Sequence, residues 1–347
     1  MGKFNMLPSD IVLDILSRSP TESILECKLV SKPFRNVIRH PSFSHKHLDH
    51  LNDFDSGKLS FISWSQFPFS YTEYDESLNR FSRKTRINLS PKFEDCCILG
   101  SCNGLICFFE WFKDHYSPAY ICNPITREYV ALPEVEVRYM LTGFGYVPST
   151  NEYKVVSICN NRRGGEWKYG TVQVYILGSG IGWRNLGNIE INMSYVSQPG
   201  EFANGAIYWA DIEEGTILAF DLAVEELRII PSPRAGEPNL VAVGNFLCAN
   251  YEEDGGSLWV LKKNENAQDV IWSKEFSHIN LEPITLTKSG GLLGYNLHDG
   301  NVYRYTPKAS PSRMLVNFGK GFRVLVLHKN TLVSLKALGE EDTELMD

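Results

Sequence analysis

The sequence predicts an α+β protein with several domains, in which a small three-helix module precedes a mainly antiparallel β domain, a β-propeller of about six blades. Apolar residues recur at helical spacing between residues 7 and 43. Beyond residue 58 they form short alternating or β-branched runs bounded by Gly, Asn and Pro, as consecutive antiparallel strands do. These changes divide the chain into a helical module (1–45), a connector (46–57), the β domain (58–338) and an acidic tail (339–347).

Composition indicates a folded protein and disfavours several classes of function. Apolar residues make up 43% and charged residues 22% of the 347 residues, which is typical of globular domains. No run approaches the roughly 18 apolar residues of a membrane-spanning helix, and no signal-peptide cleavage site follows the first residues. We therefore expect a protein of the cytoplasm, the nucleus or both, without a membrane partner and with its 8 cysteines reduced. A net charge of -7 disfavours nucleic acid as a partner.

The first predicted helix opens at Pro8, which suits a first turn because its missing N–H needs no partner there. Ile11 and Ile15 lie about one turn apart, and Leu16 joins their stripe. Pro20 then ends the helix. The pattern predicts a short amphipathic helix with an apolar side.

Two more helices are expected before the β domain. Thr21 is a candidate N-cap of the second helix and Ser31 of the third, which ends at Pro41. The residues expected to share a face are Ile24, Cys27 and Val30 in the second helix, and Phe34, Val37 and Ile38 in the third. Three helices of about three turns each bury too little surface to be comfortably stable alone. Their remaining apolar surface implies a partner.

Residues 7–43, LPSDIVLDILSRSPTESILECKLVSKPFRNVIRHPSF, closely resemble the F-box motif. The resemblance implies docking on a Skp-type adaptor, which joins the F-box to a cullin scaffold carrying a RING subunit. It assigns to adaptor binding the residues Leu7, Pro8, Ile11, Ile15, Leu16, Pro20, Ile24, Leu25, Cys27, Val30 and Phe34. Ser19, Glu26 and Phe34 stand where Leu, a basic residue and Trp are common, so adaptor affinity becomes a measurable question.

In the β domain, turns that contain Asn and Gly are each followed by a run of aromatic or aliphatic residues that predicts a strand. The expected strands include GLICFF (104–109), EYKVVSI (152–158), TVQVYIL (171–177), AIYWAD (206–211), TILAFDL (216–222), SLWVLKK (257–263), NVYRYTP (301–307) and FRVLVLH (322–328). The turns contain Asn103-Gly104, Asn204-Gly205, Gly244-Asn245 and Gly300-Asn301. Their irregular spacings are compatible with multiples of roughly 40–50 residues, the period of propeller blades, so about 280 residues predict about six blades. Trp183 and Trp209 are suited to packing between the sheets.

Six phrases of this region resemble successive segments of the plant F-box-associated domain over about residues 98–280: SCNGLICF, CNPITREYVALP, GFGYVPSTNEYKVV, VQVYILGSGIGWRNLG, FANGAIYWAD and ILAFDLAVEELRIIPSP. The resemblance implies that loops on one face of a propeller recognise a target protein. We expect the loop from Asn160 to Tyr169 to contact the target, because Arg162, Arg163 and Trp167 are of types enriched at binding hot spots. A solvated basic loop is the alternative interpretation.

Two clusters of potential metal ligands have plainer interpretations. His45, His47, Asp49 and His50 fall in the polar connector and lack a ligand pair at a familiar zinc spacing. The densest thiol cluster, made of Cys96, Cys97, Cys102 and Cys107, lacks Cys-x-x-Cys pairs, and a continuous strand would turn Cys102 and Cys107 to opposite faces. We expect no metal site.

Catalytic motifs are also missing from the sequence. Gly178, Gly180 and Gly182 indicate a hairpin turn, because neither a dinucleotide fingerprint nor a P-loop spacing is present. No G-x-S-x-G nucleophile elbow occurs. We therefore expect no cofactor, no catalytic residue and no enzymatic activity of the chain itself.

The leading hypothesis is a substrate-recognition subunit of a Skp-cullin-F-box (SCF) type E3 ubiquitin ligase, which works by holding the target near the charged conjugating enzyme. The alternative is a propeller that binds a carbohydrate or another small ligand, coupled to glycoprotein turnover. A propeller enzyme with an unrelated helical cap is a third hypothesis, and the missing catalytic motif weakens it.

Overall fold

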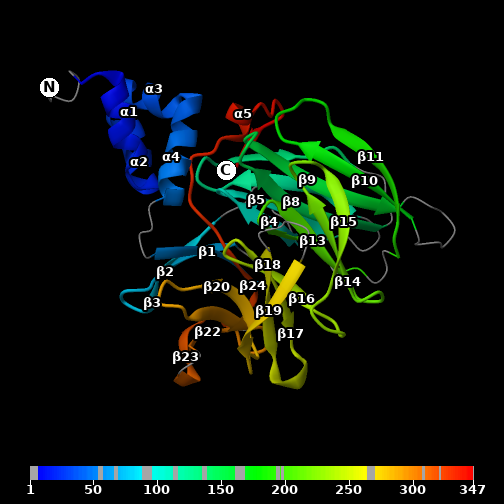
Figure 1. Cartoon of the computed structure of the whole chain (residues 1–347). Helices are drawn as coiled ribbons and strands as arrows, with labels where there is room; N and C mark the ends of the chain where they lie inside the picture. The colour runs from blue at the N-terminus through cyan, green and yellow to red at the C-terminus, as the bar shows by residue number, and fades with distance from the viewer. Residues whose placement is uncertain are drawn as a thin grey trace.

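The computed structural model of the chain contains an N-terminal helical module beside a β domain (Figure 1). It describes residues 7–53, 58–65, 69–87, 96–111, 116–134, 139–160, 169–192, 196, 199–263, 270–306, 309–319 and 322–346. The helices of the module are α1 (Ser9–Ser17), α2 (Thr21–Val30), α3 (Lys32–Arg39) and α4 (Pro41–Asp53). The three predicted helices are therefore confirmed, and a fourth follows them.

The helix caps agree with the sequence at one position and differ at another. Ser31 is the N-cap of α3, and its Oγ accepts a hydrogen bond from the backbone N–H of Phe34 at 3.3 Å. Thr21 is not a cap, because Pro20 takes that place in α2 and the Thr21 hydroxyl donates instead to the carbonyl of Asn330 at 2.8 Å. Pro41 opens α4, consistent with the fit of proline to a first helical position.

The described strands form six antiparallel sheets, which confirms a six-bladed propeller. Blade 1 contains β24 (Phe322–Leu327), β1 (Lys58–Ser65), β2 (Ser70–Asp75) and β3 (Arg80–Arg86), and blade 2 contains β4 (Cys96–Cys102), β5 (Leu105–Trp111), β6 (Tyr116–Asn123), β7 (Glu128–Ala131) and β25 (Glu344–Leu345). Blade 3 contains β8 (Tyr139–Val147), β9 (Glu152–Asn160), β10 (Tyr169–Ile176) and β11 (Trp183–Glu190).

The remaining blades repeat the same four-strand pattern. Blade 4 contains β12 (Glu201–Ala203), β13 (Ala206–Asp211), β14 (Thr216–Asp221) and β15 (Glu226–Pro231), and blade 5 contains β16 (Asn239–Val243), β17 (Phe246–Tyr251), β18 (Ser257–Lys263) and β19 (Val270–Ser277). Blade 6 contains β20 (Glu282–Leu286), β21 (Leu292–Asn296), β22 (Asn301–Thr306) and β23 (Ala309–Asn317). A 3₁₀ turn, η3 (Glu253–Gly255), and a short helix, α5 (Leu335–Leu338), complete the described elements.

The ring is closed by a strand from late in the sequence. β24 pairs antiparallel with β1, and the register runs from Phe61 opposite Leu327 to Ser65 opposite Phe322. The innermost strands, β24, β4, β8, β12, β16 and β20, contact one another in that cyclic order. Blade 1 therefore joins the two ends of the β domain, which leaves no open gap in the ring.

Neighbouring blades are joined by large buried side chains packed against glycine. Trp209 of β13 is fully buried between blades 3 and 4, and its indole N–H donates to the carbonyl of Thr142 at 3.2 Å. A Cβ added to Gly200 would lie 2.4 Å from that indole nitrogen, so the close approach requires glycine. Trp183 is half-buried and donates its N–H to the carbonyl of Pro133 at 2.9 Å. Both tryptophans thus pack between sheets, as predicted.

The structure corrects the expectation of an acidic tail at residues 339–347. β25 pairs with β7 there, and the carboxylate of Glu340 is buried. Glu340 accepts hydrogen bonds from the backbone N–H of Gly178 at 2.7 Å and from the hydroxyl of Tyr175 at 3.2 Å. Met346 is 5% exposed. The acidic composition of this segment suggested that solvent surrounds it. Instead, Gly178 and Tyr175 donate hydrogen bonds to the buried carboxylate of Glu340, and the backbone of β25 pairs with the edge strand β7.

Candidate functional site

The predicted adaptor-binding residues fall into an exposed and a buried set. On α1 and just before it, Leu7, Ile11 and Ile15 are 37%, 47% and 46% exposed, and their spacing of four residues places them on one stripe. On α2, Val30 is 70% exposed. Pro8 and Pro20 are also exposed. These side chains present uncovered apolar surface on an ordered module.

The other predicted contacts hold the module together. Leu16 is 5% exposed and Ile24 is fully buried, within a cluster formed by Val12, Leu16, Ile24, Ile38, Phe43 and Leu332. Leu25, Cys27 and Phe34 are partly buried against the same cluster. These buried and partly buried side chains pack the helices together, and this packing holds Leu7, Ile11 and Ile15 on the exposed side of the module.

Sequence reasoning missed Leu29, whose side chain, at 80%, is the most exposed of the large apolar side chains in the described part of the chain. The expected face of α2 contained Ile24, Cys27 and Val30, and Leu29 lies outside that periodicity. The available signal was that Leu29 is apolar, lies next to the apolar Val30 and does not fit the helical periodicity of the buried face. Leu29 and Val30 together form an uncovered apolar end of α2.

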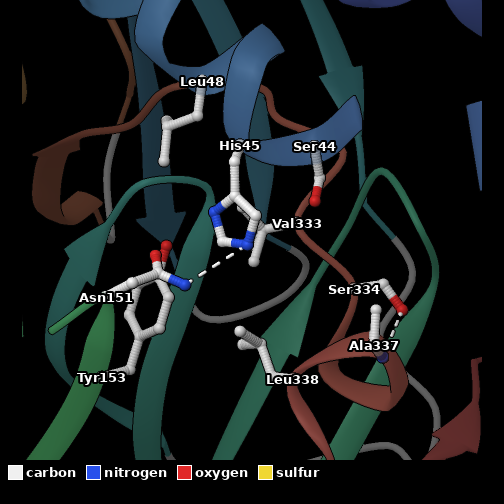
Figure 2. A pocket seen from close by; sticks show the side chains of 9 residues that line it. All are labelled: Ser44, His45, Leu48, Asn151, Tyr153, Val333, Ser334, Ala337 and Leu338. Atoms are coloured by element: carbon white, nitrogen blue, oxygen red, sulfur yellow. Dashed lines mark hydrogen bonds between the residues drawn. The ribbon is translucent and has the colours of Figure 1, made fainter. Parts of the chain in front are cut away.

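The helical module packs firmly against the β domain through α4. Figure 2 shows His45 of α4 directed at Asn151 of the β8–β9 turn, with the ring Nε2 and the amide Nδ2 3.3 Å apart. Leu48 of the same helix is 3% exposed and belongs to the core that blades 2 and 3 share. The cavity at this junction has a volume of only about 20 Å³. A polar connector was expected at residues 46–57, but 46–53 are helical and include the buried side chains of His47 and Leu48, whereas 54–57 lie outside the described residues.

The segment after β24 ties the module to the ring (Figure 1, red). Leu332 enters the core of the helical module. The side-chain amide of Asn330 donates to Glu22 at 3.1 Å, and the ammonium group of Lys329 donates to the carbonyl of Leu51 at 3.1 Å. Thr331 donates to the carbonyl of Asn103 in the β4–β5 turn at 2.7 Å. The contacts fix the orientation of the helices relative to the propeller.

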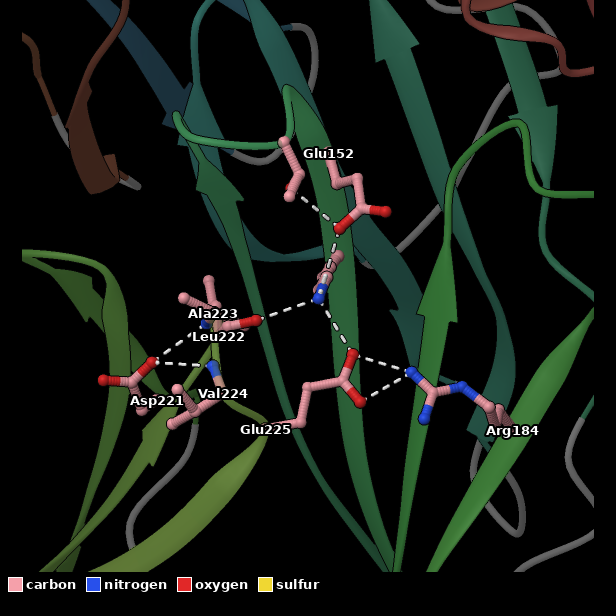
Figure 3. Close-up of polar contacts among 9 residues, drawn as sticks. Glu152, Arg184, Asp221, Leu222, Ala223, Val224 and Glu225 are labelled. Atoms are coloured by element: carbon pink, nitrogen blue, oxygen red, sulfur yellow. Dashed lines mark hydrogen bonds and ion pairs between the residues drawn. The ribbon is translucent and has the colours of Figure 1, made fainter.

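A buried ion cluster joins blades 3 and 4 (Figure 3). The ammonium group of Lys154, whose side chain is 4% exposed, donates to Glu225 at 2.8 Å and to the carbonyl of Leu222 at 2.9 Å. Arg184 donates to both carboxylate oxygens of Glu225, at 2.7 and 2.6 Å. Burial alone would raise the pKa of Glu225, but hydrogen bonds from Arg184 and Lys154 lower that pKa below its ordinary value. The cluster is a structural contact between blades.

The six innermost strands surround a cavity of about 1610 Å³. Residues 17–22, with His50 and Leu51, line its end nearest the helical module. The innermost strands begin at the opposite end of the cavity and run toward the helical module. Glu201, Asn239 and Glu282, the first residues of β12, β16 and β20, line the cavity there. The helical residues that line the cavity, 17–22 with His50 and Leu51, are all at the end near the module.

The two clusters of potential metal ligands in the sequence, for which no metal site was expected, are dispersed. His47 is fully buried with Nε2 3.1 Å from the carbonyl of Ser19, whereas His45 turns toward Asn151. Cys102 and Cys107 lie on two strands of one hairpin, so the argument from a continuous strand does not apply to them. Burial raises the pKa of Cys102 to about 12, which keeps it a thiol. Among the described residues, His, Cys, Asp and Glu side chains form no group of three that could hold a metal.

The predicted target loop is only partly described. Asn160 ends β9 and Tyr169 begins β10, at the face of the ring opposite the Asn103-Gly104 turn. Arg162, Arg163 and Trp167 lie outside the described residues. Every helix in the described part of the chain is too short or too polar to span a bilayer.

Comparison with known proteins agrees with this architecture. Residues 4–46 match the F-box domain and residues 53–291 match the F-box associated beta propeller domain. The F-box protein At3g07870 of Arabidopsis thaliana is 28% identical over 320 residues, covering 80% of this chain and 73% of its own length. The F-box protein DOR of the same plant is 29% identical over 250 residues, covering 65% and 62%.

Among solved structures, the nidogen/laminin complex has a TM-score of 0.49 at 12% identity, covering 79% of this chain and 100% of that one. A streptogramin B lyase has a TM-score of 0.44 at 14% identity, covering 79% and 94%. Neither protein's activity transfers to this chain at such scores. The F-box implies binding to a Skp-type adaptor, and its combination with this propeller supports a general role as an SCF substrate receptor. The chain belongs to the plant F-box proteins that carry an F-box-associated β-propeller domain.

Proposed function

We propose that the chain is the substrate-recognition subunit of an SCF-type E3 ubiquitin ligase in the cytoplasm, the nucleus or both. The F-box binds a Skp-type adaptor and, through it, a cullin and a RING subunit. The propeller binds a target protein, which is then ubiquitinated and degraded by the proteasome. The chain itself supplies no catalytic side chain, because its contribution is to raise the local concentration of the target near the charged conjugating enzyme.

The observation that carries this proposal is the uncovered apolar stripe of Leu7, Ile11 and Ile15 on an otherwise packed module. Covering a large apolar side chain stabilises a complex by about 1.5–3 kcal/mol. Two half-exposed isoleucines therefore account for roughly 2–3 kcal/mol of adaptor affinity, or on the order of a 100-fold change in Kd. Leu29 and Val30 extend the proposed contact onto α2.

The test is copurification with a Skp-type adaptor. The variant I11D/I15D places two charges on the stripe and should weaken adaptor binding by about 100-fold or more. Ile181→Asp is the matched control, because Ile181 is 73% exposed on the β10–β11 turn, outside residues 4–46 that match the F-box domain. Equal adaptor binding by wild type and I11D/I15D would contradict the proposed contact surface.

The loop from Asn160 to Tyr169 remains the proposed target contact, supported by its residue types. The variant R162E/R163E should lose target capture in a proximity-labelling experiment while its adaptor binding persists. Unchanged target labelling would remove the loop from the proposal.

The second candidate function is recognition of a carbohydrate or another small ligand. Its support is the central cavity, whose lining includes the aromatic side chains of Tyr71, Phe144, Phe202 and Tyr295. Aromatic faces and a few polar groups are typical of small-ligand sites. A glycan array probed with the full chain tests the idea, and an array without a bound glycan would count against a carbohydrate ligand.

A further inference from the structure

The core of the helical module contains a side chain from near the end of the chain. Leu332 is 5% exposed and lies in one cluster with Val12 and Leu16 of α1 and Ile24 of α2. Ile125 of the β6–β7 turn packs against the same cluster. Among the described residues, Leu332 is the buried member of this cluster that the β domain supplies. The helices therefore do not complete their core by themselves.

The same segment also holds the first turn of α2. Pro20 occupies the N-cap position of this helix, and its ring has no group that could accept a hydrogen bond from the helix backbone. The hydroxyl of Thr21, a residue that is 3% exposed, donates to the carbonyl of Asn330 at 2.8 Å. The side-chain amide of Asn330 donates to Glu22 at 3.1 Å. Asn330 thus contacts the start of α2 through both its backbone and its side chain.

On its other side the segment is anchored in blade 2. The side chain of Asn123, at the end of β6, is fully buried. Its amide donates to the carbonyl of Thr331 at 3.2 Å and to the carbonyl of Val333 at 2.6 Å. The backbone N–H of Leu335 donates to the carboxylate of Glu128, at the start of β7, at 2.7 Å. The propeller therefore fixes the backbone on both sides of residue 332.

The position of the segment depends on the strand that closes the ring. The backbone N–H of His328 donates to the carbonyl of Ser60 in β1 at 2.8 Å, which continues the pairing of β24 with β1. Leu332 lies five residues after Leu327, the last residue of β24. A link of five residues spans at most about 18 Å. The link is therefore too short to keep Leu332 in the helical core if β24 moves far from β1.

We propose that Asn330 and Leu332 are positioning residues for adaptor binding, so that adaptor affinity is coupled to closure of the propeller ring. They lie outside the exposed stripe of Leu7, Ile11 and Ile15 and act on it through the packing of α1 and α2. Coupling between two equilibria is reciprocal, so a bound adaptor holds the closing segment in place by the same factor by which that segment strengthens adaptor binding. The coupling rests on the proposed function, which supplies the adaptor.

The first test is the affinity of the full chain for a Skp-type adaptor, measured by biolayer interferometry. Leu332→Ala should weaken binding at least about tenfold, which means that about a tenth of the molecules keep the helices in the binding arrangement. Leu247→Ala is the matched control, because Leu247 is 2% exposed in the core between blades 4 and 5. Both variants lose a buried leucine, but the control should bind the adaptor within about twofold of wild type.

Conservative variants separate positioning from a general loss of stability. Leu332→Met nearly keeps the apolar volume, and Thr21→Ser keeps the hydroxyl that donates to Asn330, so both should bind the adaptor within about twofold of wild type. Thr21→Val keeps the size but loses the donor and should weaken binding at least about threefold. Thermal unfolding checks the fold of each variant. If Leu332→Ala does not fold, the two Thr21 variants decide the question.

Hydrogen exchange of the wild type, with and without the adaptor, tests the reciprocal effect. The backbone N–H groups of His328 and Leu335 are hydrogen-bonded at 2.8 and 2.7 Å, so their exchange reports release of the segment from the propeller. Saturating adaptor should slow the exchange of both groups by about tenfold. The backbone N–H groups of β16 and β17, in blade 5, should exchange at the same rate in both states.

Three results would overturn the coupling. One is wild-type adaptor affinity in Leu332→Ala and Thr21→Val, and another is unchanged exchange at His328 and Leu335 in the complex. The third is equal weakening by Leu332→Ala and Leu247→Ala, which would show that any loss of stability has the same effect. If the wild type and every variant bind the adaptor equally, only the coupling is rejected. A wild-type chain that does not bind the adaptor rejects the ligase role and the coupling together.

Discussion

Removing the charge of Glu225 should destabilise the propeller far more than removing a surface charge. Glu225→Gln leaves the ammonium group of Lys154, 4% exposed, with one carboxylate neighbour, Glu152 at 3.3 Å. Removing one partner of a buried ion pair costs about 3–5 kcal/mol. Because Glu152 and the carbonyl of Leu222 still contact Lys154, we expect a loss near 2–3 kcal/mol in the free energy of unfolding.

The assay is urea unfolding combined with thermal melts of the full chain. About 2–3 kcal/mol corresponds to a fall in Tm of roughly 5–10 °C for a domain of this size. The control is Arg18→Gln, because Arg18 and Asp14 form a pair whose side chains are 63% and 57% exposed, and its loss should cost less than about 0.5 kcal/mol.

A double variant distinguishes desolvation from lost attraction. K154M/E225Q removes the buried cation, so it should be at least as stable as E225Q alone rather than additively worse. The reasoning is refuted if E225Q stays within about 0.5 kcal/mol of wild type, or if the double variant loses the sum of the two single losses.

Three further results are expected. Gly104→Ala should cost more than about 2 kcal/mol in urea unfolding, because φ is +87° and the new Cβ would lie 2.1 Å from Thr331, whereas Gly180→Ala, at φ +68° with open space, should cost about 1 kcal/mol. Deleting residues 340–347 should cost about 3 kcal/mol or more, since two buried side chains are lost. Burial raises the pKa of Glu201 from its ordinary value of 4.5 to about 7, so its contribution to stability is present below pH 4.5 and is lost as pH rises toward 7. E201Q should therefore gain stability relative to wild type between pH 5 and pH 8, by up to about 3 kcal/mol.

The β domain was predictable because its turn chemistry is local. Asn103 and Gly104 both adopt positive φ, as a two-residue hairpin requires, and Asn204 with Gly205 repeats this geometry. Each of the eight expected strand segments overlaps a strand over most of its length, and several extend one residue beyond it. The register of β24 on β1 was not accessible, because pairing between distant segments leaves no local pattern.

The candidate site was less predictable than the fold. The exposed positions Ile11 and Ile15 followed from helical periodicity, but Leu16 and Ile24 share much of that periodicity and are buried. Which apolar side faces the core depends on Phe43 and on Leu332, almost 300 residues later in the sequence. Glu201, Asn239 and Glu282 are far apart in sequence and meet only because each begins an innermost strand.

The route of the segment after β24 has a consequence for synthesis. The F-box helices leave the ribosome before the propeller, yet Leu332 of their core and the Asn330 partner of Thr21 follow β24, the strand that closes the ring. A nascent chain therefore cannot complete its adaptor module before the strand that closes the ring has been made. A chain that terminates before β24 lacks both the closing strand of the propeller and the Leu332 contact of the helical core.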